Sequence, residues 1–127
     1  MDDSADKLLT GVELELMEIL WRIERGTVRD VLARLPADRP LAYTSVSTVL
    51  RILEQKGFVT ASADGRAHVY APTITRVSYE ATSVKHLVGQ LFDGRPAGLV
   101  RRLVDSASLT DADVAELRAL LDRPRRR

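Results

Sequence analysis

Apolar residues recur with helical spacing in three successive segments of the first half of the chain. A first helix is predicted after Thr10, a good N-cap with Glu13 at the capping-box position, and Gly26 ends it. Thr27 is predicted to cap a second, short helix. Thr44 is predicted to cap a third helix, whose core positions follow the spacing i, i+3, i+4, i+7. These core positions are Val46, Val49, Leu50 and Leu53.

A β-hairpin is predicted directly after the third helix. Two β-prone runs, Phe58–Ser62 and Ala67–Ala71, flank a loop that contains Asp64 and Gly65. An Asp-Gly pair favours the positive φ angles that tight hairpin turns require, and Pro72 is expected to end the second strand. The first 73 residues therefore read as three helices followed by a hairpin.

Three more helices are predicted in the second half of the chain. The first covers residues 75–92, the second begins at Pro96, and the third is capped by Thr110. Each carries one apolar stripe, and three short helices make a poor core on their own. We therefore expect a second copy of the chain to cover these stripes, so that residues 74–127 form a dimerisation domain. The expected dimer contacts are Val84, Val88, Leu91, Leu99, Val100, Leu103, Val104, Leu117, Leu120 and Leu121.

The third helix carries several hydroxyl residues in its first turns, in the run "LAYTSVSTVLRILEQKG". Such residues form helices poorly, because their side chains compete for backbone hydrogen bonds. Three helices and a hairpin make a winged helix-turn-helix domain, whose third helix enters the DNA major groove. Ser and Thr hydroxyls bond phosphates and base edges, which would explain their presence. The predicted contacts on this helix are Thr44, Ser45, Ser47, Thr48, Arg51 and Gln55.

Other roles for the same residues remain open at this level. Thr44 would serve as an N-cap in any protein, and the other hydroxyls would also suit a solvated face. The complete pattern, hairpin included, favours the DNA-binding interpretation. Tyr43 and Trp21 are assigned to the core rather than to a DNA contact.

Composition limits the remaining functions. The chain has 127 residues, no cysteine and a net charge of +1. Residues 1–72 hold nine Lys or Arg against eleven Asp or Glu, a net of −2, so overall charge does not indicate nucleic-acid binding. The acidic start has no signal-peptide pattern and no apolar run is long enough to span a membrane, so a cytoplasmic protein is expected.

Neither a cofactor nor a catalytic site is expected. Without cysteine there is no thiolate metal site, and the two histidines, His68 and His86, are predicted on separate elements. The chain has no cysteine nucleophile, glycine-rich phosphate loop or HExxH helix. We therefore expect a binding protein rather than an enzyme.

The chain resembles the penicillinase-repressor (BlaI/MecI) family of winged-helix transcriptional repressors. The resemblance rests on "ELELMEILW", "TVRDVLARL", "LAYTSVSTVLRILEQKGFV" and "DGRAHVYAP", and it continues through "LFDGRPAGLVRRLVDSASLTDADVAELRALLD". It implies a homodimer that binds a palindromic operator and blocks transcription. It also implies a wing at residues 64–68, where Arg66 matches the basic wing-tip residue of the family and His68 lies within reach of phosphate.

Two departures from the family pattern stand out. Ile52 occupies a position where the family commonly has Arg, so base preference or phosphate anchoring is expected to differ. Penicillin-responsive members are cleaved by a membrane-bound sensor protease at an Asn-Phe pair, and the aligned place here holds Arg102 and Leu103. The resemblance therefore does not extend to this mode of release.

One alternative comes from a different functional class. A winged helix also serves as a protein–protein interaction module without operator binding, and the acidic balance of residues 1–72 slightly favours that role. The hydroxyl-rich helix and the basic wing tip oppose it. A ligand-sensing regulator is a weaker alternative, because no residues in the sequence mark a ligand pocket.

Overall fold

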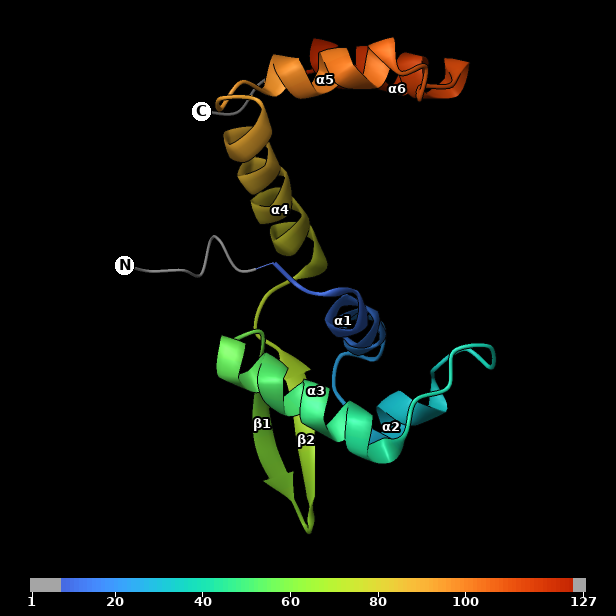
Figure 1. The fold of residues 1–127 in the computed structure, drawn as a ribbon, viewed down its shortest axis with the longest axis vertical. Helices are drawn as coiled ribbons and strands as arrows, with labels where there is room; N and C mark the ends of the chain where they lie inside the picture. The colour runs from blue at the N-terminus through green and yellow to red at the C-terminus, as the bar shows by residue number, and fades with distance from the viewer. Residues whose placement is uncertain (1–7, 125–127) are drawn as a thin grey trace. The chain divides into compact units, whose positions relative to one another are not determined.

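The computed structural model describes residues 8–124 and shows a mainly helical chain with one β-hairpin (Figure 1). The predicted fold class is therefore confirmed. The acidic start of the chain, residues 1–7, and residues 125–127 lie outside the described part. The elements are α1 (Gly11–Ile23), α2 (Val28–Ala33), α3 (Tyr43–Lys56), β1 (Val59–Asp64), β2 (Ala67–Pro72), α4 (Arg76–Leu91), α5 (Pro96–Asp105) and α6 (Asp111–Asp122).

Three helices begin with a complete capping box. In α1 the Thr10 side chain accepts from the backbone N–H of Glu13, and the Glu13 carboxylate accepts from the backbone N–H of Thr10. The Thr27 cap of α2 and the Thr110 cap of α6 repeat this arrangement with an aspartate in the third helical position. Each box satisfies two backbone donors that the first helical turn leaves free. Three of the four threonine caps predicted from the sequence are thus confirmed.

The start of α3 differs from the prediction. The N-cap is Ala42, whose carbonyl accepts the first helical hydrogen bond from the N–H of Val46 at 3.0 Å. Thr44 is therefore the second residue of the helix, and the prediction that it caps α3 was wrong. Its hydroxyl does not serve as the cap, which leaves it available at the exposed face. The helix ends at Gly57, where φ is +88°, as the glycine predicts.

The core of the N-terminal half lies where α1, α2 and α3 meet the base of the hairpin. Val46, Leu50 and Leu53 of α3 are fully buried, which fixes the face that this helix turns inward. The buried cluster comprises Leu16, Met17, Ile19, Leu20, Val28, Val31, Val46, Leu50, Leu53, Phe58, Val59 and Tyr70. Of the four core positions predicted for α3, Val46, Leu50 and Leu53 belong to this cluster and Val49 packs against it, partly buried.

The hairpin strands are each longer than predicted. Asp64 pairs with Ala67, so the connection is a two-residue turn of Gly65 and Arg66. Gly65 has φ of +65°, a conformation that costs an L side chain free energy. A backbone bridge between Gly26 and Tyr70, with N–H to carbonyl distances of 2.9 and 2.8 Å, ties β2 to the loop before α2. The turn is thus held at the end of an anchored ribbon.

The described residues divide into two compact units, one ending at Ser83 and the other beginning at Val84. The sequence placed this boundary ten residues earlier, after Thr73. The indole N–H of Trp21 donates to the carbonyl of Ile74 at 2.8 Å, and the Tyr79 hydroxyl accepts from the N–H of Leu9 at 2.9 Å. The first turns of α4 therefore belong with the winged-helix unit.

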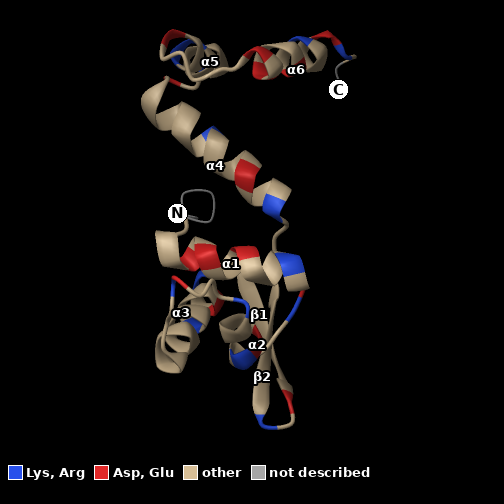
Figure 2. Cartoon of the chain, turned by 90° about the vertical axis from the view of Figure 1, so that its right-hand side faces the viewer, with Lys and Arg blue, Asp and Glu red and all other residues tan. Residues whose placement is uncertain are grey.

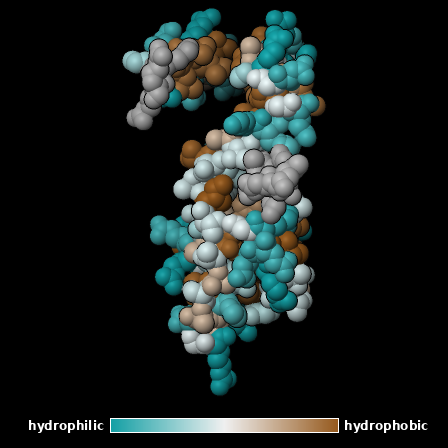
Figure 3. Space-filling model, turned by 90° about the vertical axis from the view of Figure 1, so that its left-hand side faces the viewer, coloured by the Kyte–Doolittle hydropathy of each residue, from teal (hydrophilic) through white to brown (hydrophobic). Residues whose placement is uncertain are grey.

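The second unit consists of the end of α4 with α5 and α6. In α5 and α6 no residue is buried, and in α4 only Val88 is. Apolar side chains gather on the surface of these helices (Figure 3). Pro96 occupies the first turn of α5, as predicted. Within the described residues no helix is long and apolar enough to cross a membrane.

Candidate nucleic-acid interface

The face of α3 opposite its buried stripe is polar and exposed. Successive residues of a helix are rotated by about 100°, which places Thr44, Thr48 and Arg51 on one line along the helix. Gln55 continues this line, and all four side chains are exposed. We call these four residues the outer arc. Of the other two predicted contacts, Ser45 is exposed on a flank of the helix and Ser47 is half-buried.

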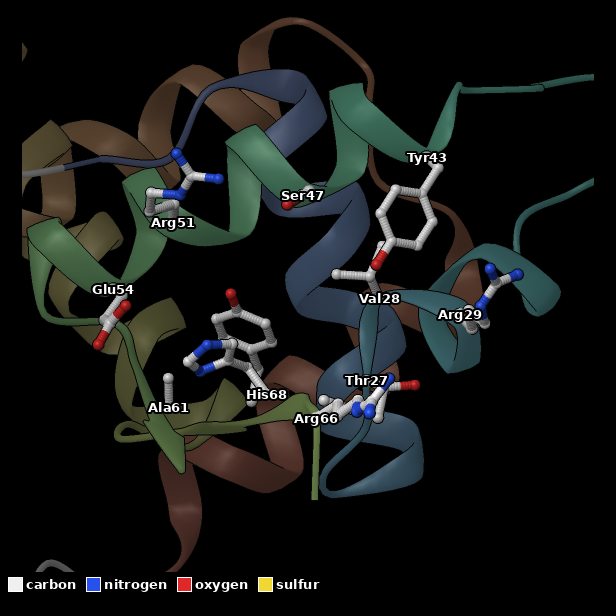
Figure 4. Close-up of a pocket in the computed structure, with 12 residues that line it drawn as sticks. Thr27, Val28, Arg29, Tyr43, Ser47, Arg51, Glu54, Ala61, Arg66 and His68 are labelled. Carbon is white, nitrogen blue, oxygen red and sulfur yellow. The ribbon is translucent and has the colours of Figure 1, made fainter. Parts of the chain in front are cut away.

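A groove of about 560 Å³ lies beside the outer arc, between α3, the hairpin and the start of α2 (Figure 4). It brings Ser47 and Arg51 of α3 together with Arg66 and His68 of the hairpin. The predicted residues Thr44, Ser45, Thr48 and Gln55 do not line it. Its lining residues are Thr27, Val28, Arg29, Tyr43, Ser47, Arg51, Glu54, Ala61, Arg66, Ala67, His68 and Tyr70.

Tyr43 was wrongly assigned to the core. Its side chain is 47% exposed and lines the groove, with the guanidinium carbon of Arg29 lying 5.4 Å from the centre of its ring. The assignment rested on the general preference of aromatic side chains for burial, whereas Tyr43 is the first residue of α3 and lies on its exposed side. The second aromatic, Trp21, is half-buried and packs against the core cluster, as expected.

Sequence reasoning also missed Thr27 and Arg29 as members of this surface. Arg29 follows the cap of α2 by two positions, between the buried Val28 and Val31. Its place on the polar side of an amphipathic helix gave a weak indication of exposure. That α2 turns this side toward the hairpin depends on tertiary packing, which a single sequence does not reveal.

Residues 8–72 hold eight Lys or Arg and eight Asp or Glu, so the acidic surplus of the first 72 residues arises from residues 1–7, outside the described part. Among the described elements, acidic residues are prominent on α1 (Figure 2). Three of its glutamates form ion pairs with bases from elsewhere in the chain. Glu13 pairs with Lys56 at 2.8 Å, Glu15 with Arg39 at 3.0 Å, and Glu18 with Arg76 at 3.0 Å. These carboxylates are neutralised locally and lie away from the groove. The net charge of −2 therefore does not describe the surface that α3 presents.

The groove itself is basic. Arg29, Arg51 and Arg66 line it, and within residues 8–124 none of them forms a salt bridge. Glu54 is the one acidic residue among its lining side chains. Burial and the Glu54 carboxylate raise the pKa of Tyr70 above its ordinary value. The groove thus offers an external anion three guanidinium groups that have no carboxylate partner among the described residues.

The two histidines lie on different elements, as predicted. His68 is in β2 and lines the groove, whereas His86 is in α4. Across the described part of the chain, no group of three or more His, Cys, Asp or Glu side chains is placed to hold a metal ion.

Comparison with known proteins gives a consistent answer. The penicillinase repressor family model matches residues 9–123. The transcriptional regulator BlaI of Mycobacterium tuberculosis is 40% identical over 119 residues, which cover 87% of this chain and 86% of that protein. The methicillin resistance regulatory protein MecI of Mammaliicoccus sciuri is 20% identical over 115 residues, covering 91% and 94% of the two chains.

A solved structure resembles the winged-helix part. The solution structure of the DNA-binding domain of the repressor BlaI covers 56% of this chain and 87% of its own, with 27% identity and a TM-score of 0.50. The family match extends beyond that domain, through α5 and α6. The chain belongs to the penicillinase repressor family.

Proposed function

We propose that this protein is a DNA-binding transcriptional repressor that occupies a palindromic operator as a homodimer. The observation that carries the proposal is the surface of α3 and its groove. Exposed hydroxyl groups lie there beside three arginines that form no salt bridge within the described residues. Phosphates attract the arginines, and base edges suit the hydroxyl groups. The family relatives, which are named as transcriptional regulators, support the same function.

In this proposal α3 enters the major groove with its outer arc toward the base edges. Thr44 and Thr48 lie in its N-terminal half, where a recognition helix approaches most closely. The Arg51 side chain reaches a guanine edge or a phosphate from the next turn. Ser45 and Ser47, on the two flanks, are suited to the phosphates of the groove walls. Gln55 contacts DNA where the helix leaves the groove.

The hairpin serves as the wing. Arg66 lies in its turn, between the paired residues Asp64 and Ala67. Blue and red segments mark the basic and acidic residues at the end of the hairpin in Figure 2. His68, two residues on, faces the same groove as Arg66. We propose that the DNA backbone passes through the groove between α3 and the wing, with the Arg66 guanidinium at a phosphate or in the adjoining minor groove.

Dimerisation is proposed to cover the apolar surface of the second unit. Leu91 is 69% and Leu121 66% exposed in the single chain, which is costly for large apolar side chains in water. Val88 is buried within one chain, and Leu99 and Leu117 are half-buried. Leu87, which was not predicted, is also exposed. The remaining exposed members of the proposed dimer surface are Val84, Val100, Leu103, Val104 and Leu120.

The signal that relieves repression is proposed to differ from cleavage at an Asn-Phe pair. Arg102 and Leu103, in α5, occupy the place where the penicillin-responsive members carry that pair. A protease that recognises an aromatic residue after Asn finds neither residue here. As a DNA-binding regulator, the protein is proposed to act in the cytoplasm.

Selection of duplexes from a random DNA library by the full-length protein tests the proposed function. We expect one enriched palindromic sequence. Thr48→Val, which removes a hydroxyl group at constant shape, should weaken its binding about fivefold. Arg51→Gln should weaken it about tenfold or more. Arg34→Gln, at the C-cap of α2 and outside the groove, is the matched control and should bind as the wild type does. No enrichment, or equal binding by all variants, would contradict the proposal.

A further inference from the structure

Tyr43 and Arg29 form a pair at one edge of the groove. Tyr43 is the first residue of α3 and Arg29 is the second residue of α2, so the pair joins the two helices of the helix-turn-helix. The Arg29 guanidinium carbon lies 5.4 Å from the centre of the tyrosine ring, within the range of a cation–π interaction. Figure 4 shows the tyrosine ring extending from α3 toward α2.

The ring restricts Arg29 without using its hydrogen-bond donors. A cation–π contact engages the face of the aromatic ring, so the N–H groups of the guanidinium remain available. Within the described residues Arg29 has no carboxylate partner, whereas Arg39 and Arg76 are both held in salt bridges. Both members of the pair are exposed. The arrangement resembles an anion-binding arm that is positioned before the anion arrives.

The place of the pair indicates which part of the DNA it meets. Tyr43 is rotated by about 100° from Thr44, toward α2 and away from the line of the outer arc. When the outer arc faces the floor of the major groove, this flank faces the wall, which is formed by sugars and phosphates. Arg66 and His68 lie across the groove on the wing side. The pair is therefore placed for the backbone, not for the bases.

We infer that Arg29 and Tyr43 together clamp one DNA phosphate at the entrance of α3, an inference that rests on the proposed DNA-binding function. The guanidinium of Arg29 donates to the phosphate oxygens. The tyrosine ring holds the guanidinium in place, and its hydroxyl donates a further hydrogen bond. The clamp sets the depth and register of α3 in the groove and carries no sequence information of its own.

The test uses the full-length protein and two duplexes, the one enriched by selection with the wild type and a scrambled duplex of equal length. Dissociation constants are measured by fluorescence anisotropy over a series of salt concentrations. The variants are Arg29→Gln, Tyr43→Phe, Tyr43→Leu and the double variant R29Q/Y43L. Arg34→Gln removes the same charge from the end of α2 and serves as the matched control.

Arg29→Gln should weaken binding to both duplexes by the same factor, about three- to tenfold. It should also reduce the slope of log K against log salt by about one. Tyr43→Leu should cost less in the Arg29→Gln background than in the wild type, because its ring acts through the guanidinium. Tyr43→Phe should keep this coupling and lose only the hydroxyl contribution.

Two results would overturn the inference. One is an unchanged slope and affinity for Arg29→Gln, equal to those of Arg34→Gln. The other is a loss confined to the selected duplex, which would make Arg29 a reader of bases. If the wild type enriches no sequence and binds both duplexes equally, the proposed function fails instead. Thermal unfolding of each variant, expected to match the wild type because both side chains are exposed, separates loss of binding from loss of folding.

Discussion

The Nζ atom of Lys56, in the last turn of α3, lies 2.8 Å from the Oε1 atom of Glu13, in the first turn of α1. The same carboxylate closes the capping box with Thr10, so one nearly buried group joins the start of α1 to the end of the recognition helix. Burial alone would raise the pKa of Glu13, but hydrogen bonds from Lys56 and Thr10 outweigh it and lower the pKa below its usual value. The ionised form is therefore favoured by folding.

A group whose pKa is lowered by folding stabilises the protein above its unfolded-state pKa. For Glu13 that value is about 4.5, and the contribution is lost as the pH falls below it. We expect Glu13→Gln to reduce the free energy of unfolding by about 1–3 kcal/mol at pH 7, and the difference from wild type to shrink below pH 4.5. Denaturant unfolding at several pH values measures this. Glu15→Gln, from the more exposed pair with Arg39, should change stability by less than about 1 kcal/mol.

The first turns of α4 should contribute to the stability of the winged-helix unit. Tyr79 packs against Trp21 and Phe58, with ring centres 5.9 and 6.0 Å apart, and its hydroxyl accepts a hydrogen bond from Leu9. A fragment ending at Ser83 should therefore unfold at a higher temperature than one ending at Thr73. Tyr79→Ala should lower the stability of the longer fragment by about 2–3 kcal/mol, toward that of the shorter fragment, which lacks Tyr79. Equal melting temperatures for the two fragments would contradict this assignment.

The wing turn should depend on Gly65. Its φ of +65° is strained for any residue with a Cβ atom, so Gly65→Ala should cost about 1 kcal/mol and loosen the turn that presents Arg66. Because the loosened turn no longer holds Arg66 in place, the affinity for DNA should also fall. Gly11→Ala is the control, because Gly11 is the first residue of α1, without a positive φ or a neighbour within 4 Å of an added Cβ. Equal effects of the two substitutions on affinity would argue against an ordered wing.

The apolar surface of the second unit should determine the oligomeric state. Introducing a charge at Leu91 or Leu121, the two most exposed leucines there, should convert a dimer into a monomer in sedimentation experiments. Leu8→Glu changes a leucine that is 41% exposed in the first unit and should leave the dimer intact. Monomeric variants should still bind half of a palindromic site. A wild type that sediments as a monomer at micromolar concentration would contradict the dimer.

Local rules predicted the helices and caps well, because capping boxes and apolar stripes are decided by residues close in sequence. The capping threonines Thr10, Thr27 and Thr110 show this. The start of α3 was misjudged by two residues, since a threonine in the first turn looks like a cap even where the backbone of Ala42 already fills that role. The core assignment of Tyr43 rested on the general preference of aromatic side chains for burial, which this exposed first residue of α3 does not follow.

The groove could be predicted only in part. The residues of the outer arc can be predicted from the helical period. The approach of α2 to the wing cannot, because it depends on long-range packing such as the bridge between Gly26 and Tyr70. The ion pairs of α1 are equally invisible in a charge count. Their partners come from residues 24 to 58 positions away, and these pairs neutralise the glutamates of α1 away from the basic groove.

A footprint of the full-length protein on the promoter region beside its own gene, over a series of salt concentrations, tests the central claim most directly. We expect a protected site with two-fold symmetry that survives moderate salt. The site should be lost with Arg51→Glu and kept with Arg34→Glu. Diffuse protection that disappears at moderate salt, or an unchanged site with Arg51→Glu, would contradict an operator read by α3.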